Sequence, residues 1–188
     1  SIEAINGITD ANLQALNGLE FTGTLPDAHT LIATATASGS ATLEFTSGID
    51  STYDAYEFRL LNMHPATDDR YFSFQVNAVG ETGFNETITS TYFRSAHNEG
   101  NSGNWVAYEG FYDQAQGTAT QALASTTGSD NDQSVSGILT LYAPSSTTFV
   151  KHFIARTNTL SNSDYSVDSF VAGYINTTAA IDEISFKF

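Results

Sequence analysis

The chain has 188 residues, of which 40% are hydrophobic and 12% aromatic, enough for one domain with a substantial buried core. Six lysines and arginines stand against 21 aspartates and glutamates, a net charge of −15, and the basic residues are scattered singly. Nucleic-acid binding is therefore excluded, an anionic membrane surface is disfavoured, and the lack of cysteine excludes disulfides and thiolate metal sites.

Residues 1–28 differ from the rest and are interpreted as an N-terminal docking segment and linker. Thr9 is a suitable N-cap, Leu13, Leu16 and Leu19 recur at a spacing of three, and Gly18 can end a helix. The sequence therefore predicts a short helix over about residues 10–17. Three interpretations stay open for it: a lid on the main domain, a segment whose leucines bind a neighbouring subunit, or a disordered segment.

Residues 29–188 carry the pattern of a single β domain. Stretches of strand-forming residues follow one another at short intervals, and breaks rich in Gly, Pro, Asn and Asp separate them. The predicted strands are 30–37, 40–46, 54–62, 70–78, 87–95, 104–111, 118–125, 134–142, 148–156, 169–175 and 181–188. This spacing indicates an all-β fold, an antiparallel β-sandwich of jelly-roll type.

The stretch from Tyr53 to Asn77 has the clearest alternation. Tyr56, Phe58 and Leu60 fall on one face of its first run, and its second run, residues 70–78, alternates in the same way after a Pro- and Asp-rich break. The pattern predicts a strand, a turn and a returning strand, which together would form the central hairpin of the sandwich.

The last predicted strand ends on Phe188, which continues the apolar face of Ile184 and Phe186. A strand that stops within its pattern is expected either to continue in further sequence or to pair with a partner chain. Phe188 therefore joins the three leucines Leu13, Leu16 and Leu19 as a predicted interaction residue.

The sequence contains no motif that indicates catalysis. It has neither a G-x-S-x-G nucleophile elbow nor an H-E-x-x-H zinc signature, and its four histidines lie far apart. Pairs of carboxylates are numerous, but an acidic chain offers such pairs by chance. The chain is therefore predicted not to be an enzyme.

One acidic turn has part of the pattern of a calcium-binding loop. Asp130 and Asp132 place oxygen ligands at alternate positions, as the start of an EF-hand does, but Val135 stands where that loop requires glycine. An EF-hand is thus excluded. A looser calcium site shared with Asp68 and Asp69 and an ordinary solvated turn both stay open, and no other cofactor is predicted.

Trp105, Tyr108, Phe111 and Tyr112 gather after a loop rich in Asn and Gly, and three of them, Trp105, Tyr108 and Tyr112, are the candidate stacking residues. Two interpretations stay open for them. Exposed aromatic faces can stack on sugar rings, so the three residues would form a glycan platform. Alternatively, aromatics at this density fill the interior of a sandwich.

Several phrases of the β domain together resemble a group of virion structural proteins of marine tailed bacteriophages. The phrases are SGIDSTYDAYEFRLLNMHPATDDRYFSFQVN, ETITSTYFRS, YDQAQGTA, SVSGILTLYAPSSTTFVKHF and AGYINTTAAIDEISFKF. The resemblance covers about residues 29–188 in the same order and leaves residues 1–25 outside. It implies a head-decoration or fibre-type protein displayed on the outside of a particle, and no catalytic residue is carried over.

The resemblance thus implies a non-enzymatic virion structural protein on the particle surface. Its expected partners are copies of itself, with a trimer favoured, and other virion proteins such as the major capsid protein. The alternative is a receptor- or glycan-binding adhesin module of a tail fibre. Neither nucleic acid nor a membrane is expected as a partner.

Overall fold

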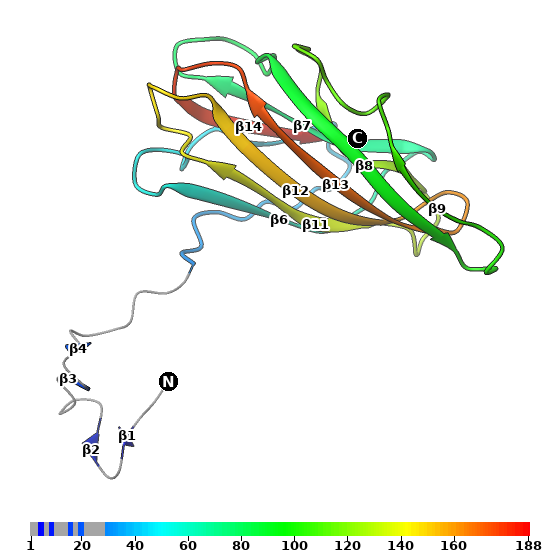
Figure 1. Cartoon of the computed structure of the whole chain (residues 1–188), viewed down its shortest axis with the longest axis horizontal. Coiled ribbons are helices and arrows are strands. Elements are labelled where there is room, and N and C mark those ends of the chain that lie inside the picture. Colours follow the sequence, from blue (N-terminus) through cyan, green and yellow to red (C-terminus); the bar gives the residue numbers. More distant parts are fainter. Residues whose placement is uncertain (1–3, 6–7, 10–14, 17–18, 21–28) are drawn as a thin grey trace. The chain divides into compact units, whose positions relative to one another are not determined.

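The computed structural model describes residues 29–188 in full (Figure 1). Of the first 28 residues it describes the backbone of four short strands, Ala4–Ile5 (β1), Ile8–Thr9 (β2), Ala15–Leu16 (β3) and Leu19–Glu20 (β4). The chain divides into two compact units, residues 1–34 and residues 35–188. All elements of the described residues are strands. These residues contain no helix that is long and apolar enough to cross a membrane.

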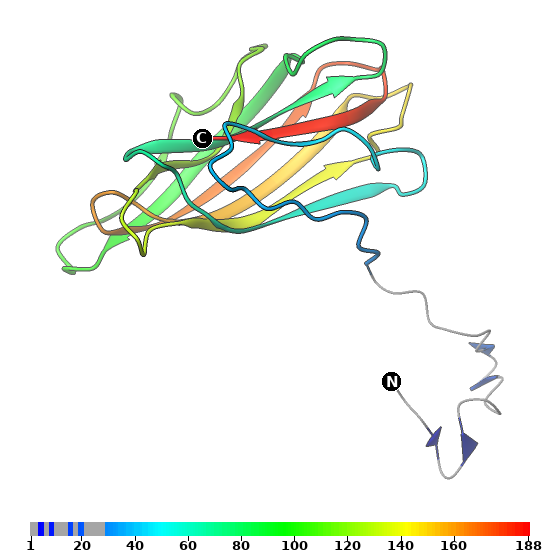
Figure 2. The same cartoon turned by 180° about the vertical axis from the view of Figure 1, so that it is seen from behind.

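The second unit consists of two antiparallel sheets (Figures 1 and 2). The four-stranded sheet has the order β10 (Gln121–Thr127), β7 (Arg70–Ala78), β14 (Ile181–Lys187), β5 (Leu43–Phe45). The six-stranded sheet has the order β6 (Ala55–Met63), β11 (Val135–Tyr142), β12 (Lys151–Leu160), β13 (Tyr165–Ile175), β8 (Ile88–Asn98), β9 (Asn104–Tyr108). The predicted all-β class is confirmed.

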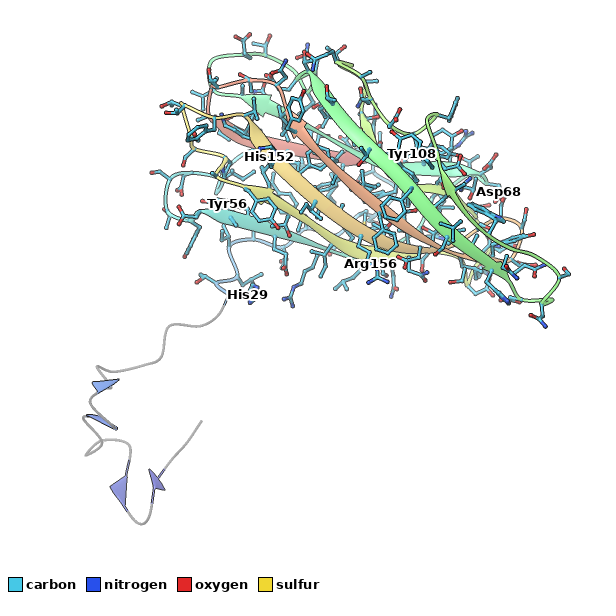
Figure 3. The ribbon with its side chains drawn as sticks, viewed as in Figure 1. His29, Tyr56, Asp68, Tyr108, His152 and Arg156 are labelled. Atoms are coloured by element: carbon cyan, nitrogen blue, oxygen red, sulfur yellow. The ribbon has the colours of Figure 1, made fainter. Side chains whose placement is uncertain are left out.

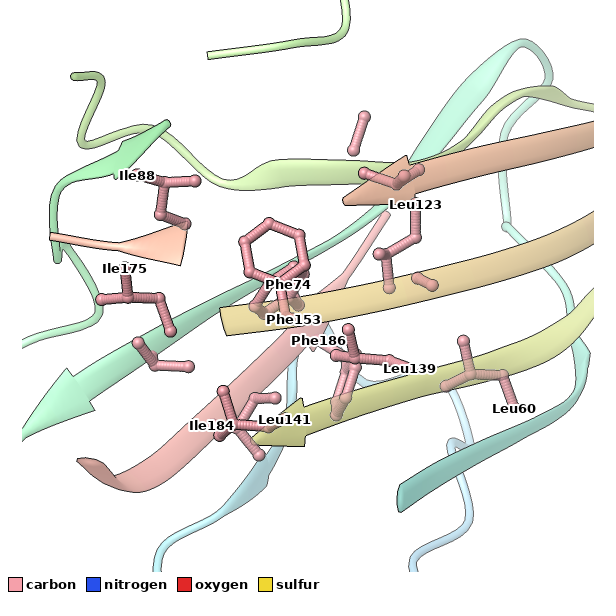
Figure 4. Packing of buried hydrophobic residues seen from close by; sticks show 14 of the residues in the cluster. Leu60, Phe74, Ile88, Leu123, Leu139, Leu141, Phe153, Ile175, Ile184 and Phe186 are labelled. Atoms are coloured by element: carbon pink, nitrogen blue, oxygen red, sulfur yellow. The ribbon is translucent and has the colours of Figure 1, made fainter. Parts of the chain in front are cut away.

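The hydrophobic core lies between the two sheets (Figure 4). Strand β7 contributes Phe74 and Val76, and the six-stranded sheet contributes Leu139 and Phe153, all of them buried. The rings of Phe74 and Phe153 meet edge to face across the core, with centroids 5.0 Å apart. Each strand therefore turns one side of its alternation inward, which makes the arrangement sandwich-like.

The predicted central hairpin is wrong, although both of its strands exist. Strand β6 pairs with β11, whereas β7 pairs with β10 and β14, so the two lie in different sheets. The reason is burial of their apolar faces. Phe58 of β6 and Phe72 of β7 both contact the ring of Phe186, at centroid distances of 5.6 and 5.9 Å. Strands in facing sheets bury such faces against the same core.

Among the other predicted strands, only that over residues 30–37 is wrong. This stretch has no strand pairing, and its Leu31 and Ile32 side chains are 79% and 47% exposed. The remaining strands are confirmed, with ends displaced by a few residues. A run of apolar and threonine residues thus does not become a strand unless a sheet edge is there to pair with it.

The predicted helix over residues 10–17 is not found. Of that span the structure describes only β3, and β3 pairs with β4 in the register Ala15↔Glu20 and Leu16↔Leu19; residues 10–14 and 17 lie outside the described part. The dipeptide between these strands is Asn-Gly, the composition that most favours a two-residue hairpin connection.

Strands β1 and β2 repeat this arrangement. Their register is Ala4↔Thr9 and Ile5↔Ile8, again with Asn-Gly between the paired residues. The surrounding sequences, IEAINGI over residues 2–8 and LQALNGL over residues 13–19, match position by position. The first unit thus contains a tandem repeat of small hairpins, and a two-stranded hairpin by itself is only marginally stable in water.

Strand β7 of the four-stranded sheet is covered by other parts of the chain on the side away from the core. Gln75 of β7 points to that side and is fully buried. Its Nε2 donates to the carbonyl oxygens of Glu86 at 2.9 Å and of Ala119 at 3.0 Å. Loop backbone therefore lies over β7 and satisfies its buried amide.

Lys151 is a buried cation at the start of β12. Its side chain is fully buried, and its Nζ donates to the carbonyl oxygens of Phe149 at 3.1 Å and of Thr177 at 3.2 Å. Burial removes water from the ammonium group and lowers the pKa of Lys151 below its ordinary value of 10.5.

Replacing this lysine should change how stability depends on pH. Between its lowered pKa in the folded state and 10.5, the unfolded chain holds the Lys151 proton more strongly, so this group makes stability rise with pH. The unfolding free energy of wild type should therefore gain on that of Lys151→Met as pH increases from 7 toward 10.5. Denaturant titrations measure the difference, with Lys187→Met as the control for loss of one charge; parallel curves for wild type and Lys151→Met would contradict the expectation.

Candidate interaction surfaces

The outer face of the six-stranded sheet, the side away from the core, carries apolar side chains (Figure 3). Along β12, Phe153 and Ala155 are buried, whereas Ile154 between them is 54% exposed and points outward. Every strand of this sheet contributes to the outer face. Its exposed large apolar residues are Leu61, Phe93, Val106, Tyr108, Ile138, Tyr142 and Ile154.

One row of side chains crosses this face from edge to edge. Directly paired positions on successive strands are Arg59, Ile138, Arg156, Phe170, Phe93 and Tyr108, which we call the outer row. The guanidinium carbon of Arg156 lies 4.7 Å from the ring centre of Phe170. On the other side of Phe170 the ring of Phe93 stacks at 4.8 Å, with the ring planes 2° apart. Both ring faces of Phe170 are thus occupied.

The charges on the outer face cancel in pairs. Arg59 Nε lies 2.6 Å from Glu57 Oε1, and Arg156 donates to both carboxylate oxygens of Asp168 at 3.0 and 2.7 Å. The hydrogen bonds that Arg156 donates to the Asp168 carboxylate raise the pKa of Arg156. Exposed pairs of this kind add little stability, but they leave the face neutral in a chain whose net charge is −15.

The outer face is hollowed at one end. A shallow depression of about 460 Å³ lies over the small Ala172, between Tyr142, His152 and Tyr174. The His152 and Tyr174 rings are 6.2 Å apart. The depression is open and mostly apolar, so it offers a place for a side chain from another surface.

The structure does not assemble the predicted glycan platform. Trp105 and Tyr108 are three positions apart in β9, and alternation therefore puts them on opposite faces of the sheet. Tyr108 belongs to the outer row. Trp105 lies with Tyr112 on the other side, where the guanidinium carbon of Arg94 is 4.7 Å from the Trp105 ring and 5.2 Å from the Tyr112 ring.

Arg94 connects the two sheets at this edge of the sandwich through its hydrogen bonds. Its side chain is 12% exposed, and its Nε donates to Glu109 Oε1 at 3.0 Å. Its Nη1 donates to Ser125 Oγ of the opposite sheet at 2.5 Å. Trp105 and Tyr112 thus hold a structural cation between their rings, and these ring surfaces are occupied within the chain.

A different group of aromatics lines a groove. Tyr71, Phe111 and Tyr112 form its wall, with Asp113 and Gln114 at its rim, and its volume is about 350 Å³. The Phe111 side chain is 75% exposed, and its ring lies 6.1 Å from that of Tyr71 and 5.3 Å from that of Tyr112. Sequence reasoning missed Tyr71 as a member because it comes from a distant strand.

The carboxylate at the rim of this groove is tied to the outer row. The hydroxyl of Tyr108 donates to Asp113, and this hydrogen bond to the carboxylate raises the pKa of Tyr108. The contact joins the groove to the edge of the outer face through one pair of side chains.

The predicted calcium ligands are partly close together. Asp68 Oδ1 accepts from the backbone N–H of Ser129 at 3.1 Å, so Asp68 does reach the turn that holds Asp130 and Asp132. Among the described residues, however, no three His, Asp or Glu side chains gather closely enough to hold a metal ion.

The predicted interaction residues at the two chain ends differ in position. Phe188 is half-buried, and its ring lies 5.0 Å from that of Phe72, so it extends the core of its own domain. Leu16 and Leu19 face each other in the β3–β4 hairpin, and Leu13 lies outside the described residues.

No protein-family model, curated protein or solved structure matches the chain.

Arg94 can be tested with the single tryptophan of the chain as a reporter. Replacing Arg94 by Met removes the cation beside Trp105 and leaves Glu109 without the ion pair, which should lower stability by about 1–2 kcal/mol. Trp105 emission should shift to longer wavelength, and acrylamide should quench it more strongly. Arg59→Met, at the far edge of the sheet, is the control; identical spectra for both variants would show that Arg94 does not shield the indole.

Proposed function

We propose that this chain is a non-enzymatic virion structural protein, a capsid-decoration or fibre-type module displayed on the surface of a phage particle. The observation that carries the proposal is the outer face of the six-stranded sheet. It is broad, it presents exposed large apolar side chains from several strands, and its arginines are already paired with carboxylates. Such a surface works by burying area against another protein. The resemblance of residues 29–188 to phage virion proteins supports the same conclusion.

The strand order supports a fold of the jelly-roll type, which recurs in virion proteins. Along the chain, β5, β7, β10 and β14 belong to the four-stranded sheet. The intervening segments β6, β8–β9 and β11–β13 belong to the six-stranded sheet. The chain thus crosses between the sheets repeatedly, as in a wound double-sheet fold. Before its last crossing, to β14, the chain forms a meander of the three strands β11, β12 and β13 in the six-stranded sheet.

The tandem hairpins of residues 2–20 are the proposed attachment segment. Repeats that bury little alone gain stability by stacking on neighbouring repeats, and the chain provides two of them. In the proposed role, this segment docks on other virion proteins, such as the major capsid protein, or on copies of itself. The unit of residues 35–188 is then presented outward.

Deletion of residues 1–28 tests the attachment role. The truncated chain should fold with an unchanged melting temperature because residues 35–188 form a compact unit of their own. It should nevertheless be lost from particles purified by density gradient, as measured by mass spectrometry against the full-length chain. Undiminished incorporation would contradict the docking role of this segment, and cryo-EM without matching density on the particle would contradict the proposed function.

A second candidate, a glycan-binding adhesin module, is favoured by the aromatic groove. Phe111 presents an exposed ring beside the Tyr71 and Tyr112 rings, and Asp113 and Gln114 supply polar groups at the rim. Aromatic surfaces with a few polar groups are the usual composition of small-ligand sites. On this proposal the sugar ring stacks on Phe111 rather than on Trp105.

Glycan arrays with a matched pair of variants test this candidate. Phe111→Ala removes the exposed ring of the groove and should weaken binding at least about tenfold. Phe149→Ala removes a ring that is 71% exposed and outside the groove, against 75% for Phe111, and should leave binding unchanged. Absence of binding by wild type, or equal losses in both variants, would remove the adhesin function.

A further inference from the structure

We propose that the outer face of the six-stranded sheet is an interface between two copies of this chain, which pack face to face across a two-fold axis. The inference rests on the proposed function and deepens it, because it names the protein that binds the outer face. Three observations support a second copy as the occupant: the area of the face, its charge, and the orientation of its rings.

The area of the face matches the need of a stable dimer. Six strands at about 4.8 Å spacing span about 29 Å, and about eight residues at 3.3 Å each span about 26 Å. The face therefore offers on the order of 800 Å², which is what each partner contributes to an interface of standard size. Two sheets that meet in this way pack at about 10 Å, as the layers of a sandwich do.

The charge distribution identifies where two copies can approach. Two chains of net charge −15 repel each other over most of their surface. Along the strands of the outer face the two arginines, Arg59 and Arg156, are balanced by Glu57 and Asp168, and the Asp113 carboxylate at its edge accepts a hydrogen bond from Tyr108. A second copy therefore meets the least repulsion at this face, whereas a strongly basic partner would find no acidic cluster there.

The rings of the outer row favour protein packing over sugar stacking. Arg156 and Phe93 cover both faces of the Phe170 ring, so its edge is what faces outward. Edges of stacked rings, together with Ile138 and Ile154, form a surface for apolar side chains. The depression over Ala172 can receive a protruding side chain of the second copy.

Pairing through this face has a consequence for the oligomer. A single surface that meets itself does so across a two-fold axis. The contact therefore joins copies in pairs, and a trimer, which the resemblance to virion proteins implies, would require another contact elsewhere on the chain.

Sedimentation velocity of the purified full-length protein tests the proposal with two pairs of variants. Ile154→Glu and Ile154→Lys place a charge of either sign on the outer face. Val79→Glu and Val79→Lys do the same at a residue with the same exposure, 54%, outside that face. Because both Ile154 and Val79 are exposed, all four variants should fold, and their melting temperatures verify this. Using both signs separates the interface from the net charge.

The expected result is a reversible wild-type dimer that strengthens when salt is raised to about 0.5 M, because salt screens the repulsion between the copies. Both Ile154 variants should weaken dimerisation at least about tenfold, since each would bury an unpaired charge, and both Val79 variants should match wild type. The proposal would be overturned if wild type stayed monomeric both at low salt and at the raised salt concentration. It would also be overturned if neither Ile154 variant weakened the dimer. A dimer from a chain that is absent from particles would instead contradict the proposed function and leave the interface intact.

Discussion

The edge-to-face contact between Phe74 and Phe153 joins the two sheets, and the remaining structure depends on it. Phe153 reaches its position because the neighbouring strand has Gly173 beside it. A Cβ at Gly173 would lie 2.8 Å from Phe153 Cζ and 2.4 Å from the carbonyl oxygen of Thr89. Losing a buried phenylalanine side chain costs about 3–5 kcal/mol. Alternate residues of each strand are thus buried in this core. The residues between them face away from the core and must be covered by loops, water or another protein.

The two sheets meet this requirement differently, and the difference is the basis of the functional proposal. Loop backbone lies over β7 on the far side of the four-stranded sheet and accepts hydrogen bonds from the buried Gln75. The six-stranded sheet has no such cover over its described outer face, where Ile138, Ile154 and Phe93 are 42%, 54% and 44% exposed. Its charges are paired locally, so the acidic excess of the chain lies elsewhere. A neutral apolar face on an acidic molecule favours contact with another protein.

The aromatic residues show how far sequence reasoning can reach toward a site. Trp105, Tyr108 and Tyr112 are close in sequence, yet they divide between two environments because an odd spacing in a strand reverses the face. That part could be read from the sequence. The pairing of Phe93 with Phe170 could not, because these residues are far apart in the chain and meet only through the register of β8 and β13. The Asn-Gly hairpins could be read locally, and a helical interpretation of the leucine spacing obscured them.

The sequence by itself determined the all-β class, most strand positions and the inward residues such as Phe58 and Phe74, because alternation with period two is a local property. Only the tertiary structure decided that β6 and β7 lie in opposite sheets, that Arg94 of β8 joins the two sheets at one edge by its bond to Ser125 of β10, and that the outer row exists. The physical reason is that strand partners are chosen by closing a common core. This choice depends on contacts between distant segments, which no local pattern encodes.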